Sequence, residues 1–144
     1  MVQGLDPILV IGAGSTGAAV ACDLAQRGLP VLVVEQGEPS SGTTGRNHAL
    51  VHSGGRYVVK DPESARECAE ENRVLRRIAA GLIEPTGGLF VAVDEEDLAY
   101  KAEFLAAAAA TGVWAREITP SEALAREPQL NPNLLAAVTV ADAV

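Results

Sequence analysis

The sequence is poor in aromatic and in basic residues. Aromatics make up 3% of its 144 residues, so a core must be built from the aliphatic side chains and alanines that dominate its 48% hydrophobic content. Eleven Lys and Arg face 19 Asp and Glu, which gives a net charge of −8. This balance disfavours nucleic acid as a partner, because binding a phosphate backbone needs a basic face. It equally disfavours adhesion to an anionic membrane through scattered charge.

Cysteines and long apolar runs are also scarce. Cys22 and Cys68 do not have the spacing of a metal site, and the two isolated histidines do not complete one, so no metal centre is expected. No apolar run reaches the roughly 20 residues that a membrane-spanning helix needs. The first residues carry an acid and no basic segment, which argues against a secretory signal. The sequence therefore predicts a cytoplasmic α/β protein without a transmembrane segment.

The first 35 residues predict a β-α-β unit. Residues 8–11 form a continuous apolar run, typical of a strand that is buried on both faces of a parallel sheet. A helix with a small-residue face is predicted over 15–27, and a second apolar strand over 31–34. Residues 37–55 are rich in Gly, Ser and Thr and show no sustained period. A loop of that length in a compact domain is usually functional or disordered, and its hydroxyls, amides and histidines favour a functional loop.

Helices and strands alternate in the rest of the chain. The pattern predicts a helix over 61–79, a strand over 89–93 and a helix over 94–111. A capping box at 119–122 begins a short helix, and 134–140 is the last predicted strand. These strands are too few to complete a doubly wound sheet. We therefore expect an α/β fold that is an incomplete part of a larger one.

Residues 12–17 read Gly-Ala-Gly-Ser-Thr-Gly, which matches the G-x-G-x-x-G pattern. The match is meaningful because it follows a predicted strand and opens a predicted helix. Gly12 permits the tight turn, and Gly14 lets the backbone approach a pyrophosphate. Gly17 allows the helix to pack closely on the strand. The motif predicts a dinucleotide site.

Two further features of this unit suit a dinucleotide. The backbone around Ser15 and Thr16 lies at the start of a helix, where the partial positive charge favours phosphate. Glu35 ends the second strand, where its carboxylate can accept hydrogen bonds from an adenosine ribose. The same carboxylate would repel the 2′-phosphate of NADP. FAD and NAD share this pattern, so it leaves both open.

A more specific signal lies in residues 41–57, which read Ser-Gly-Thr-Thr-Gly-Arg-Asn-His-Ala-Leu-Val-His-Ser-Gly-Gly-Arg-Tyr. Similar signals lie in residues 61–68, 84–90, 127–128 and 131–132. Together with the glycine turn, these segments make the chain resemble the FAD-dependent glycerol-3-phosphate dehydrogenases. The likeness is strongest to the flavoprotein subunit of the anaerobic type, within the D-amino-acid-oxidase-like flavoprotein superfamily. It spans nearly the whole chain.

The resemblance implies a division of the chain and a set of FAD contacts. Residues 1–83 would be the N-terminal part of a Rossmann-like FAD-binding domain, and 84–144 the start of a substrate-binding α+β region. In the family, the region matching 41–48 follows the pyrophosphate and ribityl chain, and the region matching 52–56 reaches the flavin ring. The cofactor residues expected here are Gly12, Gly14, Ser15, Thr16, Gly17, Glu35, Gln36, Ser41, Gly42, Thr43, Thr44, Arg46, Asn47, His48, His52, Ser53 and Gly54.

His52 and Arg56 are the predicted catalytic residues. The arginine that matches Arg56 is expected to touch the substrate phosphate, for which a guanidinium fork is suited. A structural salt bridge is the alternative for Arg56. His52 is a candidate proton acceptor, or a group that hydrogen-bonds the flavin or the backbone. Ala143 stands where family members read glycine, which puts in question whether residues 1–144 close a working site.

The implied reaction is oxidation of sn-glycerol 3-phosphate to dihydroxyacetone phosphate with FAD as cofactor. Electrons would pass to a quinone, directly or through electron-transfer subunits, with peripheral association at the inner face of the cell membrane. Two alternatives stay open: another member of the superfamily that oxidises an amino acid or a 2-hydroxy acid, and a nucleotide-binding fragment without turnover. An NAD-dependent dehydrogenase is a weaker option, because nothing after Glu35 resembles a nicotinamide site.

Overall fold

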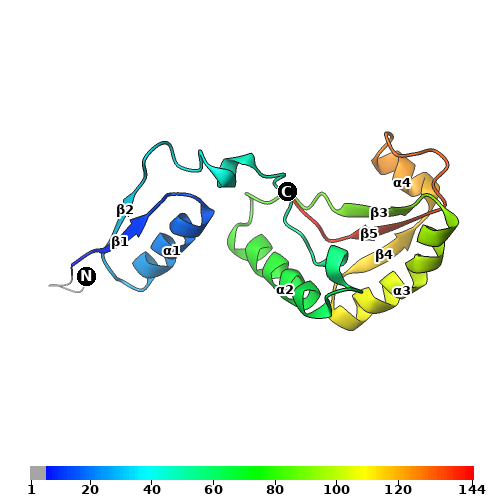
Figure 1. The fold of residues 1–144 in the computed structure, drawn as a ribbon, viewed down its shortest axis with the longest axis horizontal. Helices are drawn as coiled ribbons and strands as arrows, with labels where there is room; N and C mark the ends of the chain where they lie inside the picture. Colours follow the sequence, from blue (N-terminus) through cyan, green and yellow to red (C-terminus); the bar gives the residue numbers. More distant parts are fainter. Residues whose placement is uncertain (1–5) are drawn as a thin grey trace. The chain divides into compact units, whose positions relative to one another are not determined.

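The computed structural model describes residues 6–144 (Figure 1). The chain forms two compact units, of which one ends at His48 and the other spans Ala49–Val144. This division reflects packing within the chain, and the functional boundary between residues 83 and 84 stays a prediction. Among residues 6–144, no helix combines the length and the hydrophobicity that crossing a membrane requires.

The N-terminal unit contains the predicted β-α-β arrangement. Strand β1 (Ile8–Ile11) pairs in parallel with β2 (Val31–Val34) along its whole length. Helix α1 (Ser15–Gln26) connects them and contacts both. The loop that follows contains one turn of 3₁₀ helix, η1 (Thr43–Arg46). The sequence prediction for this unit is confirmed in element type and order.

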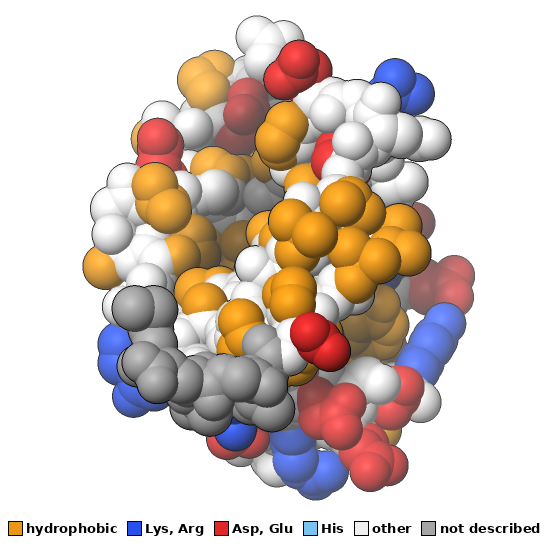
Figure 2. Space-filling view, turned by 90° about the vertical axis from the view of Figure 1, so that its left-hand side faces the viewer, with side chains coloured by type: hydrophobic (Ala, Val, Ile, Leu, Met, Phe, Trp, Pro, Cys, Tyr) orange, Lys and Arg blue, Asp and Glu red, His pale blue; other side chains and the backbone are white. Residues whose placement is uncertain are grey.

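The strands of this unit are not buried, so the prediction of a strand covered on both faces was wrong for β1. Ile8, Leu9 and Ile11 are 40%, 55% and 81% exposed. Figure 2 shows hydrophobic side chains at the surface of the face it draws. Among residues 6–144 each of the two strands pairs only with the other, and within residues 6–48 no residue is buried. An apolar run indicates that a strand should be covered, but the covering must come from other elements.

The C-terminal unit is built on an antiparallel sheet with the order β3-β5-β4. Its strands are β3 (Gly88–Ala92), β4 (Ala115–Ile118) and β5 (Ala136–Val140). Its helices are η2 (Gly55–Tyr57), α2 (Pro62–Ile78), α3 (Glu95–Thr111) and α4 (Pro120–Arg126). Figure 1 shows α2 and α3 on one side of this sheet and α4 on the other. The central strand β5 is buried along its whole length, and β4 was not predicted.

Local signals account for the ends of these helices. The side chain of Asp61 accepts the Ser64 N–H and caps α2, as predicted. At α4 the Thr119 and Glu122 side chains satisfy each other's backbone N–H groups, which is the predicted capping box. Gly112 ends α3 at a φ of 72°, in the left-handed region that glycine favours.

The core of this unit lies on both faces of β5. On the side of α2 and α3, Val138 and Val140 pack with Phe104, whose ring centroid lies 4.9 Å from that of Phe90. On the side of α4, Ala137 packs with Ala123 and with other aliphatic residues. The alternation of residues along β5 therefore supplies both clusters.

Candidate functional site

The turn between β1 and α1 is held by backbone contacts that glycine permits. Gly12 has a φ of 100°, and its N–H donates to the carbonyl of Val34 at 2.8 Å. A Cβ on Gly17 would lie 2.0 Å from the carbonyl oxygen of Gly12, which leaves no room for a side chain. The tight turn and the close packing expected of these two glycines are both present.

The N-terminus of α1 donates a hydrogen bond to a side chain of the loop that follows β2. Its N-cap is Gly14, which provides no side-chain cap, and the hydroxyl oxygen of Thr44 accepts the Ser15 N–H at 3.0 Å. The N–H of Thr16 also belongs to the first turn, where a helix leaves its donors without helical partners. An oxygen acceptor at this position is the kind of group that a phosphate supplies. The donors present therefore fit a pyrophosphate.

Glu35 lies across the same turn. One carboxylate oxygen accepts the Ala13 N–H at 2.8 Å, and the other accepts the Gly37 N–H at 3.0 Å. These backbone donors, that of Ala13 first, hold the pKa of the Glu35 carboxyl below its usual value. The carboxylate is thus charged at neutral pH, as required of a group that accepts hydrogen bonds from ribose hydroxyls.

A hollow of about 520 Å³ opens beside Glu35 at the carboxyl ends of β1 and β2. Nucleotides bind at this end of the strands in parallel α/β sheets. The hollow is lined by Ile11, Gly12, Val34, Glu35 and Gln36. Of the predicted cofactor residues, Gly12, Glu35 and Gln36 thus share one surface.

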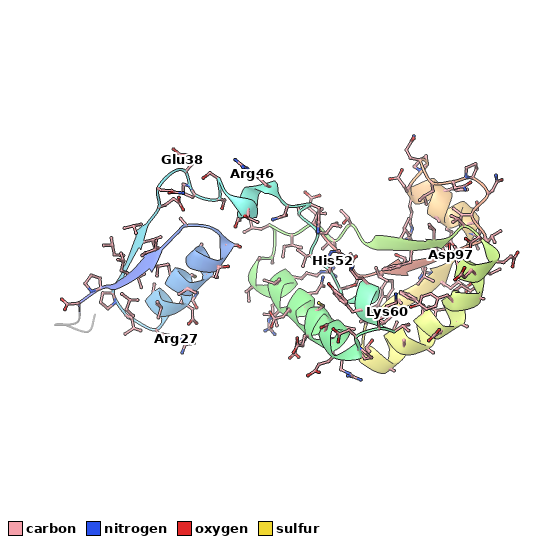
Figure 3. All side chains as sticks on the ribbon, in the orientation of Figure 1. Arg27, Glu38, Arg46, His52, Lys60 and Asp97 are labelled. Atoms are coloured by element: carbon pink, nitrogen blue, oxygen red, sulfur yellow. The ribbon has the colours of Figure 1, made fainter. Side chains whose placement is uncertain are left out.

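The loop from residue 36 to residue 48 reaches back to the glycine turn. The Ser40 N–H donates to the carbonyl of Ala13 at 3.2 Å, and the side-chain amide of Asn47 donates to the carbonyl of Thr44 at 2.8 Å. Arg46 extends from η1 into solvent (Figure 3). The predicted residues of this loop that are exposed are Ser41, Gly42, Thr43, Arg46, Asn47 and His48. The side chain of Thr44 accepts a hydrogen bond from the start of α1.

The predicted residues from His52 onward belong to the C-terminal unit. His52, labelled in Figure 3, lies in the segment that leads into η2. Val51 and Ala143 form an antiparallel bridge, in which the Val51 N–H donates at 2.8 Å and the Ala143 N–H at 3.2 Å. The buried side chain of Asn72 on α2 donates to the carbonyl of Val51 at 2.9 Å. Sequence reasoning missed Asn72, which is the buried polar residue of an otherwise apolar helix face.

Asp142 organises this segment, and it was not among the predicted site residues. One of its carboxylate oxygens accepts both the N–H and the hydroxyl of Ser53, each at 2.7 Å. The other carboxylate oxygen lies 3.6 Å from Nδ1 of His52. The sequence signal was weak, since Asp142 lies 89 residues after Ser53.

The two glycines after Ser53 are explained by packing within the unit. Gly54 has a φ of 96°, and a Cβ there would lie 2.4 Å from the carbonyl oxygen of Ala65. A Cβ on Gly55 would lie 3.0 Å from the ring of Phe90. The predicted contact of Gly54 with a flavin stays a prediction.

Arg56 is exposed, with its guanidinium carbon 6.0 Å from the centre of the Tyr57 ring. Within residues 6–144, no carboxylate forms an ion pair with it. The structural salt bridge that was the alternative role is therefore absent from the described part of the chain. The same residues contain no group of histidine, cysteine and acidic side chains arranged to hold a metal.

Ala143 replaces the glycine expected from the resemblance without disturbing this junction. Its side chain is fully buried, and both its N–H and its carbonyl bond to Val51. Among residues 6–144, its φ is not one of those in the left-handed region. Alanine is therefore accommodated here without strain.

Comparisons with known proteins agree with this geometry. One subunit of the anaerobic glycerol-3-phosphate dehydrogenase of Escherichia coli (strain K12) is 50% identical over 135 residues, which cover 94% of this chain and 25% of that protein. One subunit of the Haloferax volcanii enzyme of the same name is also 50% identical, over 94% of this chain and 23% of that protein. The chain thus spans about a quarter of the length of these curated relatives.

The fold has close structural counterparts. The crystal structure of L-proline dehydrogenase from P. horikoshii matches with a TM-score of 0.77 at 26% identity, over 96% of this chain and 37% of that one. This match confirms the predicted α/β fold as part of a larger one. A family model described as DAO, FAD dependent oxidoreductase, matches residues 7–144 and confirms FAD as the expected cofactor. The chain belongs to the DAO family of FAD-dependent oxidoreductases.

Proposed function

We propose that the protein containing this chain oxidises sn-glycerol 3-phosphate to dihydroxyacetone phosphate. The observation that carries the proposal is the 50% identity, over 94% of the chain, to two proteins named as subunits of anaerobic glycerol-3-phosphate dehydrogenase. The matched region covers 94% of the chain and therefore includes residues of both compact units. FAD, when bound, supplies the acceptor for the two electrons and the hydrogen that leave C2 of the substrate.

In this proposal the N-terminal unit holds the cofactor. The first turn of α1 binds the pyrophosphate through the N–H groups around Ser15, and the Thr44 hydroxyl adds a donor. Glu35 accepts hydrogen bonds from the ribose. These roles are supported by the bond from Ser15 to Thr44 and by the charged carboxylate next to the hollow.

The C-terminal unit supplies the residues that act on the substrate. As the C2–H bond breaks and its hydrogen leaves with the electron pair, the hydroxyl proton must go to a base, and a C=O bond forms. We assign this proton to His52 and the substrate phosphate to Arg56. A guanidinium that is exposed and has no carboxylate partner within residues 6–144 is suited to a dianionic phosphate.

We also propose that the electrons pass on to a quinone, directly or through electron-transfer subunits. The relatives' names support a multisubunit enzyme, since both are called subunits. The protein would then act in the cytoplasm, peripherally at the inner face of the cell membrane. Recovery in the membrane fraction that is lost on a high-salt wash would support this location.

The test begins with FAD binding, with NAD as the control. The longest form of the protein that contains residues 1–144 is titrated with FAD, followed by flavin fluorescence, and with NAD, followed by calorimetry because the oxidised nicotinamide does not fluoresce. We expect saturable binding of FAD and none of NAD. Preferential binding of NAD would contradict the proposal.

The second step measures reduction of the bound FAD. Under anaerobic conditions, glycerol 3-phosphate should bleach the visible flavin absorbance, whereas glycerol, lactate and L-proline should not. L-Proline is included because of the fold shared with L-proline dehydrogenase. Reduction by L-proline or lactate alone would favour an amino-acid or 2-hydroxy-acid oxidoreductase.

The substrate role of Arg56 has its own variant. Arg56→Gln should raise the half-saturating concentration of glycerol 3-phosphate by about 10-fold or more, because a charge-assisted hydrogen bond is worth about 1.5–3 kcal/mol. Arg73→Gln, which removes an exposed arginine of α2, is the matched control and should leave it unchanged. Equal effects of the two substitutions would contradict a phosphate contact.

A further inference from the structure

We propose that Asp142 is the positioning residue for His52. This inference rests on the proposed function, because it assigns a task to the base of that reaction. With Nδ1 of His52 turned to Asp142, the other ring nitrogen, Nε2, is the atom that accepts the substrate hydroxyl proton. Both residues lie within the compact unit Ala49–Val144.

The two oxygens of the Asp142 carboxylate have separate tasks. Oδ1 accepts two hydrogen bonds from Ser53, from its N–H and from its hydroxyl, each at 2.7 Å. Ser53 is 3% exposed, so these bonds are shielded from water and fix the plane of the carboxylate. Oδ2 then lies 3.6 Å from Nδ1 of His52. Catalytic contacts of this kind are often long before substrate binds.

Three segments of the chain build this position. The bridge between Val51 and Ala143 aligns the backbones on either side of the contact. The carbonyl of Asp142 accepts the Gly87 N–H at 2.9 Å. A Cβ on Gly88 would lie 2.9 Å from Oδ2 of Asp142, so glycine at the start of β3 leaves space for the carboxylate. Asp142 is thus held by both its main chain and its side chain.

A carboxylate at this place acts on His52 in two ways. It selects the imidazole tautomer that carries the proton on Nδ1, which leaves Nε2 as an acceptor. It also stabilises the positive charge that the ring gains when Nε2 takes a proton. Two other charged groups belong to the same surroundings, because Arg76 and Arg126 line a hollow of about 490 Å³ together with Asp142. Arg126 donates to the hydroxyl of Thr139 at 3.2 Å.

Asp142→Asn separates these effects from a structural role. The amide oxygen can still accept both bonds from Ser53, so the segment stays in place. The amide NH₂ then faces Nδ1 of His52, so that two hydrogen-bond donors oppose each other when Nδ1 carries the proton. The ring avoids this by carrying its proton on Nε2, and Nε2 can no longer accept a proton from the substrate.

The experiment uses the longest form of the protein that contains these residues, loaded with FAD. Anaerobic rapid mixing with glycerol 3-phosphate gives the limiting rate of flavin reduction and the half-saturating concentration. For Asp142→Asn we expect a limiting rate that is lower by about 10- to 100-fold, with unchanged FAD content and half-saturation. Arg126→Gln removes a charge from the neighbouring hollow and should keep the wild-type limiting rate.

The possible failures are distinguishable. If glycerol 3-phosphate does not reduce the wild-type flavin, the proposed function itself is refuted. If the wild type is reduced and Asp142→Asn has the same limiting rate, or if Arg126→Gln slows reduction equally, the positioning role is overturned.

A second variant covers the case in which Asp142→Asn fails to hold FAD. Asp142→Glu keeps the negative charge near His52, and His52→Gln sets the rate without a base. A limiting rate for Asp142→Glu above that of His52→Gln supports the inference, and a rate equal to it overturns the inference.

Discussion

Replacing Gly54 by alanine should destabilise the C-terminal unit through two separate costs. The first is conformational, because Gly54 has a φ of 96°, where an L-residue is strained by about 1–2 kcal/mol. The second is steric. The added Cβ would lie 2.4 Å from the carbonyl oxygen of Ala65 and 3.1 Å from a methyl group of Val113. Ala65 and Val113 are both buried, so neither can move without disturbing the core.

The expected magnitude follows from these two costs. Overpacking a well-packed site costs about 1–3 kcal/mol. Added to the conformational cost, this predicts a loss of roughly 2–5 kcal/mol in the free energy of unfolding. Such a loss is a large part of the stability of an ordinary domain.

Gly112 provides the matched control. It has a φ of 72°, and a Cβ there would meet nothing within 4 Å. Gly112→Ala should therefore show the conformational cost alone, about 1–2 kcal/mol. Both variants are unfolded in urea and followed by far-UV circular dichroism, with the fluorescence of the single tryptophan, Trp114, as a second probe. Equal destabilisation by the two substitutions would refute the steric part of the reasoning.

Two further substitutions test contacts of the same unit. Asn72→Ala removes the donor to the carbonyl of Val51 and should lower the free energy of unfolding by about 1–3 kcal/mol in urea, and an unchanged midpoint would contradict this. Asp61→Asn tests the cap of α2, where the Ser64 hydroxyl first and its N–H second hold the pKa of the Asp61 carboxyl below its usual value. A depressed pKa stabilises the fold above the unfolded value and loses this effect as the pH falls through the folded value. The urea midpoints of wild type and Asp61→Asn should therefore differ at neutral pH and converge in acid, and a difference that widens in acid would count against the cap.

Where the fold could be predicted, the signals lie within one or two turns of the residues they control. The start of α4 depends on Thr119 and Glu122, which are three residues apart. The end of α3 depends on Gly112 alone. The glycine turn is similar, since Gly17 packs against Gly12 five residues earlier. Each of these features was predicted correctly because its cause lies in the same stretch of sequence.

Strand β4 shows why other features were missed. Ala115–Ile118 contains Arg116 and Glu117 in its centre, so it has no apolar run that would indicate a strand. It is a strand because it pairs with the buried β5, with Ala115 opposite Val140. Strand β1 shows the opposite case. Its apolar residues were enough to predict a strand, but its burial depends on other elements that pack against it, and β1 is largely exposed.

The candidate site also contains one part that could be predicted from local sequence and one part that could not. The dinucleotide part depends on Gly12, Gly17 and Glu35, whose contacts lie within the first compact unit and follow from a known pattern of residues. The segment with His52 is different, because its residues are recognisable from their order, but their position is set by Asp142 from 89 residues away. Motifs therefore identify the residues that touch a cofactor or a substrate more readily than the residues that orient them. An orienting carboxylate need only lie at the right place in the fold, and no local pattern in the sequence marks that place.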